Sequence, residues 1–528
     1  MPATYTYPGV YVEELPSGVR TIVGVSTSET AFIDVFARGP VGRAVRITSF
    51  AEFERVFGGL YPRSEASYAI RQYYLNGGQI AWVVRIAPGN PGRASRTLAG
   101  GSPPQNTLRI RAANPGDWGN ELRVAIVNSS AGAFDLHVRQ VRQVSGSEQV
   151  VASEVHRNLT MSVTSPRFAV NFVNAISTLV ELEDLSIGEL PNGDAATPSG
   201  GAPEAAFAPL TGGNDGAAFQ DDGAFTDANA FATSLSDGLD ALDRIEPFIF
   251  NILCLPVAGH LPATQLTAVI SEATTFCADR RAFLIVDIPP TVTTPGTDGN
   301  GMTTWMTAND GLRHRNAAVY FPRLRVADPL NEGRLRDIGP SGTMAGVYAR
   351  TDANRGVWKA PAGTDAALRG ARLAATITDG ETGGLNPLGV NVLRNFPIFG
   401  NVSWGARTLE GADQQASEWK YIPVRRTALF LEESLFQGLK WVVFEPNDEP
   451  LWAQIRLNVG SFMNGLFRQG AFQGASPREA YFVKCDKETT TQADIDRGIV
   501  NILVGFAPLK PAEFVVIQIQ QIAGQLET

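Results

Sequence analysis

Residues 67–86, SYAIRQYYLNGGQIAWVVRI, hold the pattern that decides the fold class. The first part, 67–75, is compatible with a helix. Asn76-Gly77-Gly78 ends that helix, because glycine readily adopts the backbone angles found just past a helix terminus. The apolar run 80–86 then has the length and composition of a buried strand. A helix, a glycine stop and a buried strand in this order are typical of a layered α/β domain.

The same alternation of helices and apolar strands occurs elsewhere in the chain. Ala31–Ile33 is a further predicted strand near the N-terminus. Buried strands that alternate with helices predict a parallel sheet covered on both faces. The later members of this series are helices near 227–242 and 263–277 and strands at 248–253, 283–287 and 317–320.

Turn-rich segments divide the chain into five predicted parts. Proline and glycine gather at 87–92, after which short alternating strands replace the helix–strand alternation. This change predicts a β-rich domain inserted into the α/β core. Both ends of the chain are β-prone and predict extended arms. The predicted parts are an N-terminal arm at 1–20, a discontinuous core at 21–87 and 210–400, a β-rich inserted outer domain at 88–209, an α+β C-terminal domain at 401–511 and a C-terminal arm at 512–528.

Composition excludes several classes of protein. The 528 residues include 44 Lys and Arg against 53 Asp and Glu, a net charge of −9, which argues against binding to nucleic acid. Charged residues are 18% of the chain, below the roughly 25% of ordinary soluble domains. A large protein with so few surface charges is expected to cover much of its surface with partners.

The compartment is inferred from features that the sequence lacks. The first residues carry Glu13 and Glu14 where a signal peptide is still apolar, and no stretch has the length of a spanning helix. The three cysteines form no CxxC pair, so no disulfide framework is implied. We therefore expect the protein to remain in the cytoplasm or to leave it without a signal peptide.

One motif suggests an enzyme. Ser341-Gly342-Thr343-Met344-Ala345 resembles the subtilisin nucleophile motif Gly-Thr-Ser-Met-Ala without its central serine, and Asp287, His314 and Ser341 follow the subtilisin order. However, His314 precedes Arg-Asn rather than Gly-Thr, and the serine is displaced by two residues. A displaced nucleophile does not point at the same base. We therefore expect no catalytic residues.

Metal and cofactor motifs are likewise missing from the sequence. His137, His156, His260 and His314 are scattered and are not paired with cysteines at ligand spacing. No phosphate-binding loop of the G-x-x-x-x-G-K-[ST] type is present, and Gly212–Gly216 is interpreted as a tight turn. The expectation is that the protein uses no metal and no cofactor.

Taken together, the motifs of this chain resemble those of the tail sheath proteins of contractile bacteriophages and related contractile injection systems. Seven motifs in the same order carry the resemblance, and residues 88–209 contribute only Gly116–Asn120. The seven are PGVYVEE at 8–14, NGGxxAWVVR at 76–85, LTGGNDG at 210–216, PSG at 340–342 with ARTD at 349–352, RGVWKAPA at 355–362, YIPVRR at 421–426 with FEPND at 444–448, and PLKPAEF at 508–514.

This resemblance implies a structural role. Sheath subunits stack helically around an inner tube and contract from a metastable extended state, which drives the tube into a target. The implied partners are further copies in stacked six-subunit rings, an inner tube protein, and baseplate and terminal cap proteins, with no nucleic acid and no membrane insertion. The implied fold is an α/β core like a subtilisin sheet without catalysis, a β-rich inserted domain, and an α+β C-terminal domain with extended arms. The implied location is the bacterial cytoplasm during assembly and then a phage tail or a similar particle.

The resemblance also implies which residues join subunits. Terminal arms of sheath proteins add strands to a neighbour's C-terminal domain, although an N-terminal strand can also dock on its own domain. The helix at 450–468 is interpreted either as core packing or as a tube-docking element. The residues expected in strand exchange are Val10, Tyr11, Val12, Glu13, Phe514, Val515, Val516, Ile517 and Ile519, and those expected to face the tube are Trp452, Arg456, Asn464 and Arg468.

Two other functions stay open at this point. A degenerate subtilisin-like serine hydrolase predicts that a fluorophosphonate probe reacts at Ser341. A surface or polysaccharide-binding protein predicts that the β-rich part at 93–200 binds glycans.

Overall fold

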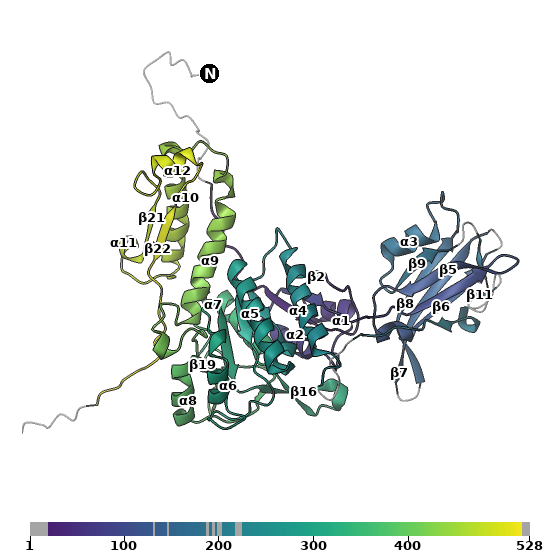
Figure 1. Ribbon diagram of the computed structural model, residues 1–528, viewed down its shortest axis with the longest axis horizontal. Coiled ribbons are helices and arrows are strands. Elements are labelled where there is room, and N and C mark those ends of the chain that lie inside the picture. The colour runs from purple at the N-terminus through teal and green to yellow at the C-terminus, as the bar shows by residue number, and fades with distance from the viewer. Residues whose placement is uncertain are drawn as a thin grey trace, which may run out of the picture. The chain divides into compact units, whose positions relative to one another are not determined.

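A computed structural model describes residues 20–129, 132–144, 147–185, 189–192, 196–197, 203–216 and 224–519. The chain divides into two compact units (Figure 1). The larger unit is Ser26–Arg425, and the smaller unit joins the chain start, up to Val25, with the segment that begins at Arg426.

An eight-stranded sheet forms the centre of the larger unit, in the order β2-β3-β1-β13-β14-β15-β19-β20. The six central strands are parallel, and the edge strands β2 and β20 are each antiparallel to their neighbour. This confirms the predicted parallel sheet. The strands are β1 (Thr30–Asp34), β2 (Ala44–Ile47), β3 (Ala81–Arg85), β13 (Ile252–Cys254), β14 (Phe283–Val286), β15 (Ala317–Phe321), β19 (Val390–Phe396) and β20 (Gly400–Ser403).

Helices cover both faces of this sheet, as predicted (Figure 1). Apolar side chains of α4, α5 and α6 join one face in a single core that includes Ile33 and Leu253. Aromatic side chains of α2 and α7 pack on the other face, where the rings of Phe32 and Tyr73 lie 5.7 Å apart. The helices of this unit are α1 (Phe50–Phe57), α2 (Glu65–Asn76), α4 (Ala228–Asp243), α5 (Ala263–Asp279), α6 (Met302–Ala308), α7 (Ser341–Arg355) and α8 (Asp379–Leu385).

Helices α2 and α7 approach each other closely because α7 carries two glycines one turn apart. A Cβ atom on Gly342 would lie 2.4 Å from the carbonyl oxygen of Ala69, and one on Gly346 would lie 2.5 Å from that of Tyr73. Both neighbours are backbone atoms, so a side chain at either glycine would push the two helices apart.

We therefore expect Gly346→Ala to destabilise the larger unit. The gain in helix propensity of about 1 kcal/mol is outweighed by overpacking, so the net loss in unfolding free energy is about 1–3 kcal/mol. Thermal denaturation followed by circular dichroism measures it. Gly383→Ala on α8 is the matched control, because nothing lies within 4 Å of a Cβ atom there. Equal melting temperatures for the two variants would contradict this account of the helix contact.

A β-rich domain is inserted between β3 and α4. Its two sheets have the orders β10-β4-β5-β9 and β11-β6-β7-β8, with β12 also paired to β6, and they enclose their own apolar core. The segments that enter and leave it run side by side, since the backbone N–H groups of Gly92 and Ser95 donate to Asn214 and Thr211. The elements are β4 (Ser95–Gly100), β5 (Gln105–Ala112), β6 (Leu122–Asn128), β7 (Phe134–Val144), β8 (Ser147–Leu159), α3 (Ala169–Ile176), β9 (Val180–Asp184), β10 (Pro191–Asn192), β11 (Ala196–Thr197) and β12 (Ala208–Pro209).

Another small sheet of the larger unit lies after β15. It has the order β17-β16-β18, and its strands are β16 (Leu324–Ala327), β17 (Leu335–Ile338) and β18 (Arg372–Leu373).

The smaller unit combines helices with a two-stranded antiparallel sheet. Its compact part begins at Arg426 rather than at the expected residue 401. Residues just after 401 belong to the larger unit, since β20 pairs with β19 and the Leu409 N–H donates to the Ala317 carbonyl oxygen. The elements are α9 (Ile422–Gly438), within which the division between units falls, α10 (Glu449–Arg468), α11 (Pro477–Ala480), β21 (Tyr481–Lys484), α12 (Gln492–Asp496) and β22 (Leu503–Phe506).

The first described residues also belong to this smaller unit. The Arg20 N–H donates to Asn458 Oδ1 at 3.1 Å, and the Val25 N–H donates to Ser434 Oγ at 3.2 Å. The first and the last described residues therefore belong to the same unit. Among the described helices, none combines the length and the hydropathy needed to cross a membrane.

Candidate functional site

The structure brings together two of the three residues that suggested a hydrolase. Asp287 directly follows β14, and Ser341 begins α7. The Ser341 N–H donates to Asp287 Oδ1 at 3.0 Å, and the Ser341 hydroxyl donates to Oδ2. Both residues are buried. The hydroxyl proton is therefore directed at a carboxylate, with no imidazole between the two groups.

His314 does not complete a catalytic triad. Its Nδ1 accepts the N–H of Asn316 at 3.0 Å. The charged groups that act on it are Arg315, Glu410 and Arg425, and Asp287 is not among them. Because a serine nucleophile needs a base within hydrogen-bond distance, the subtilisin order in the sequence does not correspond to a subtilisin site in the structure.

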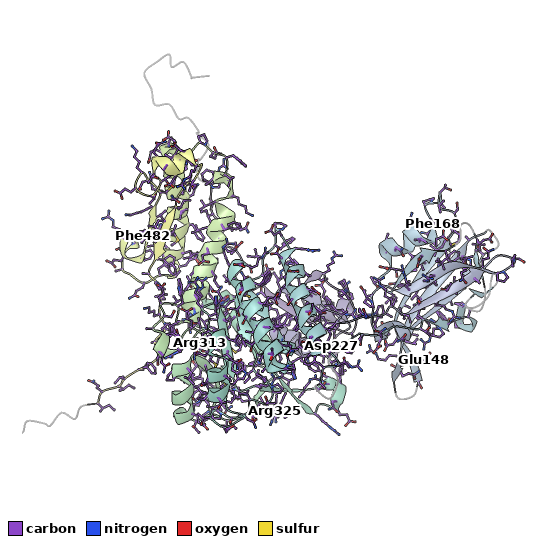
Figure 2. The ribbon with its side chains drawn as sticks, viewed as in Figure 1. Glu148, Phe168, Asp227, Arg313, Arg325 and Phe482 are labelled. Carbon is purple, nitrogen blue, oxygen red and sulfur yellow. The ribbon has the colours of Figure 1, made fainter. Side chains whose placement is uncertain are left out.

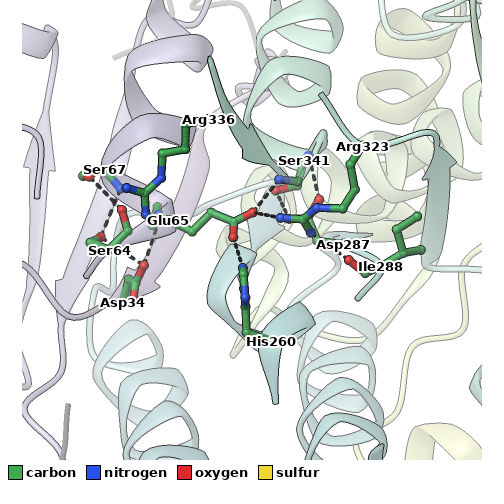
Figure 3. A network of polar contacts seen from close by, with 12 residues as sticks. Asp34, Ser64, Glu65, Ser67, His260, Asp287, Ile288, Arg323, Arg336 and Ser341 are labelled. Carbon is green, nitrogen blue, oxygen red and sulfur yellow. Dashed lines mark hydrogen bonds and ion pairs between the residues drawn. The ribbon is translucent and has the colours of Figure 1, made fainter. Parts of the chain in front are cut away.

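A buried ionic cluster lies beside this pair, and sequence reasoning missed it (Figure 3). Glu65, the first residue of α2, accepts hydrogen bonds from Arg323 Nη2 at 2.7 Å and from the Gly339 N–H, and it also contacts His260 Nε2. The Glu65 and Arg323 side chains are 3% and 4% exposed. His260 follows β13 and Arg323 follows β15, so the cluster ties together segments at the carboxyl ends of the two parallel strands that flank β14. That edge is where parallel sheets gather polar residues, which is the signal that would have found the cluster.

The pKa values of three buried carboxyl groups, those of Asp287, Asp34 and Glu65, shift in different directions. Burial affects all three. It raises the pKa of Asp287 to about 6, and the nearby charge of Glu65 adds to this effect. It raises the pKa of Asp34, at the end of β1, to about 7, although three hydrogen bonds oppose the shift. Burial also acts to raise the pKa of Glu65, but Arg323 and His260 outweigh it and lower the value to about 2. Glu65 is thus a fixed anion whose charge is matched by its neighbours.

A pH-dependent stability follows from Asp287. Its folded-state pKa is raised, so the folded state keeps a proton that the unfolded state has lost, and stability falls as pH rises from about 4 to about 6. Asp287→Asn keeps the shape of the side chain without the ionisation. We expect the wild type to lose about 2 kcal/mol more than this variant between pH 4.5 and 7, measured by chemical denaturation at each pH.

The exposed pair of Asp337 and Arg325 provides the control for this experiment. Asp337→Asn should keep the wild-type pH profile. An Asp287→Asn profile parallel to the wild type would contradict the proton assignment.

Other reactive groups are few in the part of the chain that is described. There, no three His, Cys, Asp or Glu residues are grouped so as to hold a metal ion. The three cysteines are free and buried. Burial raises the pKa of the Cys277 thiol and of the Cys254 thiol, so neither is an activated nucleophile.

The residues predicted for strand exchange fall into two groups. Val10, Tyr11, Val12 and Glu13 lie outside the described residues. The C-terminal group is described and forms no strand within this chain. Its five apolar side chains, Phe514, Val515, Val516, Ile517 and Ile519, are 74–92% exposed.

The same unit contains a sheet with free edges. β21 and β22 pair only with each other among the described strands. Phe482 on β21 and Leu503 on β22 are about half exposed, and Figure 2 labels Phe482. Such a sheet offers unpaired backbone groups to an incoming strand.

The four predicted tube-facing residues do not share one exposed face of α10. Trp452 is 2% exposed, and its indole N–H donates to Asn447 at 2.9 Å, so it is a core residue and we remove it from the predicted tube surface. Arg456 pairs with Glu449 at 2.7 Å and is half-buried. Asn464 is half-buried and Arg468 is exposed. With Trp452 removed, the predicted tube surface consists of Arg456, Asn464 and Arg468, which lie further toward the C-terminal end of α10.

Comparisons with known proteins agree with the sequence motifs. The sequence model of the phage tail sheath C-terminal domain family matches residues 414–522. A tail sheath protein of Vibrio phage KVP40 is 26% identical over 316 residues, which is 55% of this chain and 44% of the relative. A putative prophage major tail sheath protein of Pseudomonas aeruginosa is 26% identical over 36% of this chain and 48% of the relative. The chain thus spans about half the length of the curated relatives it matches.

Solved structures with a similar fold are also sheath proteins. The sheath of an extracellular contractile injection system in its contracted state has a TM-score of 0.57 and 23% identity, over 98% of both chains. The contracted helical sheath of the anti-feeding prophage has a TM-score of 0.56 and 23% identity, over 98% of this chain and 100% of that one. A sheath tail protein of Listeria innocua has a TM-score of 0.60 at 15% identity, over 93% and 96%. The chain therefore resembles contractile tail sheath proteins, in sequence over residues 414–522 and in fold over nearly its whole length.

Proposed function

We propose that this chain is the structural subunit of a contractile sheath. It polymerises helically around an inner tube and contracts from a metastable extended state, which drives the tube into a target. The observation that carries this proposal is the exposed apolar segment 514–519 in the same unit as the open sheet of β21 and β22. The fold, shared with sheath proteins solved in contracted helical assemblies, supports it.

Strand exchange supplies the join between copies. An extended arm that pairs with a sheet edge gains main-chain hydrogen bonds, and its alternating side chains determine the register. The donor arm and the acceptor sheet are different surfaces, so each added copy presents a new free site and the polymer grows as an open helix. The described parts of both arms belong to the smaller unit. We therefore propose that this unit is where strand exchange links the copies into a continuous network, which we call the mesh.

Contraction then requires a change in packing without breaking the mesh. Extended arms tolerate reorientation, while the sheet-based domains move as rigid bodies between two lattices. The free-energy difference between the lattices is stored during assembly, so the mechanism needs no nucleotide. The large sheet serves as a subtilisin-like scaffold without catalysis, in keeping with the direct bond between Ser341 and Asp287.

The proposed partners follow from the same role. They are further copies in stacked six-subunit rings, an inner tube protein, and baseplate and cap proteins. A baseplate structure of the anti-feeding prophage contains a chain of similar fold. Arg456, Asn464 and Arg468 are the proposed tube contacts. Assembly is proposed in the bacterial cytoplasm, within a phage tail or a phage-tail-like particle.

Electron microscopy tests the proposal. The chain, expressed with its tube protein and negatively stained, is expected to form long striated cylinders that enclose a tube. Monomers at every concentration tested would overturn the proposed function.

A further inference from the structure

A basic pocket lies at the C-terminal end of α7 in the larger unit. It is a cavity of about 300 Å³ that α7 and the loop after it line. Four cations face it, Arg350, Arg355, Lys359 and Arg369, against a single carboxylate, Asp365. We call this set of residues the basic pocket. A concentration of positive charge is unexpected in a chain with a net charge of −9.

Three of these four cations have no carboxylate partner among the described residues. Arg350 donates to the carbonyl oxygens of Asn76 at 2.8 Å and Ala367 at 2.6 Å. Lys359 Nζ donates to the carbonyl oxygens of Ala360 at 3.1 Å and Ala362 at 3.4 Å. These backbone contacts hold the charged groups in place without neutralising them.

The fourth cation is only weakly paired. Arg355 lies 3.4 Å from Asp365, but the two side chains are 57% and 75% exposed, and such surface pairs contribute little. Burial lowers the pKa of Lys359 and the charge of Arg355 lowers it further, while the charge of Asp365 opposes part of this shift. Burial and the charge of Arg369 likewise lower the pKa of Arg350. The pocket is therefore preorganised for an anion that would relieve this repulsion.

An acidic loop in the smaller unit carries the opposite charge to the basic pocket. Residues 443–449, which lead from α9 into the first residue of α10, have the sequence Val-Phe-Glu-Pro-Asn-Asp-Glu, and we call them the acidic loop. Phe444 is fully exposed and has a φ of +70°, a left-handed conformation that costs a non-glycine residue about 1–2 kcal/mol. A strained and exposed aromatic residue is typical of a segment that serves a binding function.

Within the acidic loop, Glu445 is the carboxylate available to a partner. Asp448 caps α10 through the Glu449 N–H at 2.7 Å, and Glu449 pairs with Arg456 at 2.7 Å. Glu445 has no side-chain partner among the described residues. Its aromatic neighbour Phe444 can stack on an arginine, as aromatic rings do with guanidinium groups.

We propose that the acidic loop of one copy docks in the basic pocket of a second copy. This inference rests on the proposed polymerisation and adds a contact that does not involve the arms. Glu445 supplies the anion for Lys359, and Phe444 packs on the aliphatic stems and guanidinium groups of the pocket. Because pocket and loop are different surfaces, the contact propagates along a polymer instead of closing a dimer.

Reciprocal charge reversal tests the contact. Lys359→Glu and Glu445→Lys are each expected to raise the concentration needed for cylinder formation at least tenfold, measured by pelleting and electron microscopy. The double variant restores the pair with reversed polarity and should assemble within about threefold of the wild type. Two single variants mixed in equal amounts should also assemble, because each then meets a complementary surface on the other chain.

Every result of this experiment has a clear consequence. Wild-type assembly of Lys359→Glu would overturn the role of the pocket. A double variant no better than Lys359→Glu would overturn the acidic loop as occupant. Rescue in the double variant but not in the mixture would place the contact within one chain and would also overturn the proposal.

Matched controls separate this inference from folding and from the proposed function. Lys487→Glu and Glu488→Lys make the same charge changes at exposed positions outside both surfaces and should assemble normally. Monomers of all variants should keep the wild-type melting temperature. In assembled wild-type protein, a carbodiimide should join Lys359 to Glu445 of different chains, and absence of that product would overturn the contact. A wild type that forms no cylinders would instead count against the proposed function.

Discussion

Deletion of residues 514–528 is expected to leave a folded chain that no longer forms cylinders. The five apolar side chains of the described part of this arm are 74–92% exposed, so their removal takes little from the fold. Their loss removes the strand that would pair with a neighbour's open sheet. We expect at least a tenfold rise in the concentration needed for assembly, measured by sedimentation, with an unchanged melting temperature for the monomer.

A point substitution separates strand pairing from simple loss of apolar surface. Ile517→Pro removes one backbone N–H and restricts the backbone, while most of the arm keeps its side chains. It should weaken assembly, whereas Ile517→Val should not. Deletion of Met1–Glu14 is also expected to weaken assembly. Cylinders of normal length that contract after either deletion would contradict the arm mesh.

Glu65→Gln should produce the largest loss of stability in the described core. The substitution leaves Arg323 charged and 4% exposed, without the anion that it pairs with at 2.7 Å. Removing one member of a buried ion pair costs about 3–5 kcal/mol. Denaturant unfolding of the isolated chain measures the loss, and the main effect should be a lower midpoint for the larger unit.

The control for Glu65→Gln is Asp337→Asn, which breaks the exposed contact with Arg325. This change should cost no more than about 1 kcal/mol. If both variants unfolded at the same denaturant concentration, the cluster would not carry the stabilising role assigned to it.

Local patterns predicted five strands of the large sheet, β1, β3, β13, β14 and β15, because each is encoded within a few residues, whereas β2, β19 and β20 were not predicted. The apolar run that became β3 and the glycine stop at Gly77, whose φ is +117°, are both visible in a short window. The stripe of α10 was also visible, but one periodicity serves equally for a core and for a docking face. The burial of Trp452 decided between these two at that position.

The buried cluster was not predictable in this way. Glu65 and Arg323 are 258 positions apart, and only the strand order brings them together. The pair of Asp287 and Ser341 was noticed for another reason, because its sequence order resembles that of an enzyme. The structure brings that pair together in direct hydrogen bonds, without the imidazole that a catalytic triad would place between them. Contacts of the arms lie beyond any single chain, so they remain predictions.

The chain enters and leaves the inserted domain at adjacent positions, so the domain can be replaced as a unit; we call it a cassette for this reason. Its connecting segments are hydrogen-bonded to each other at Gly92 with Asn214 and at Ser95 with Thr211, so the chain enters and leaves the domain at one place. Side-chain contacts such as that of Arg38 with Gln140, at 2.7 Å, also join the domain to the core. Evolution can therefore vary, enlarge or remove this cassette while the sheet and the arms are preserved. The same junction is a natural point at which to graft a foreign domain onto the chain.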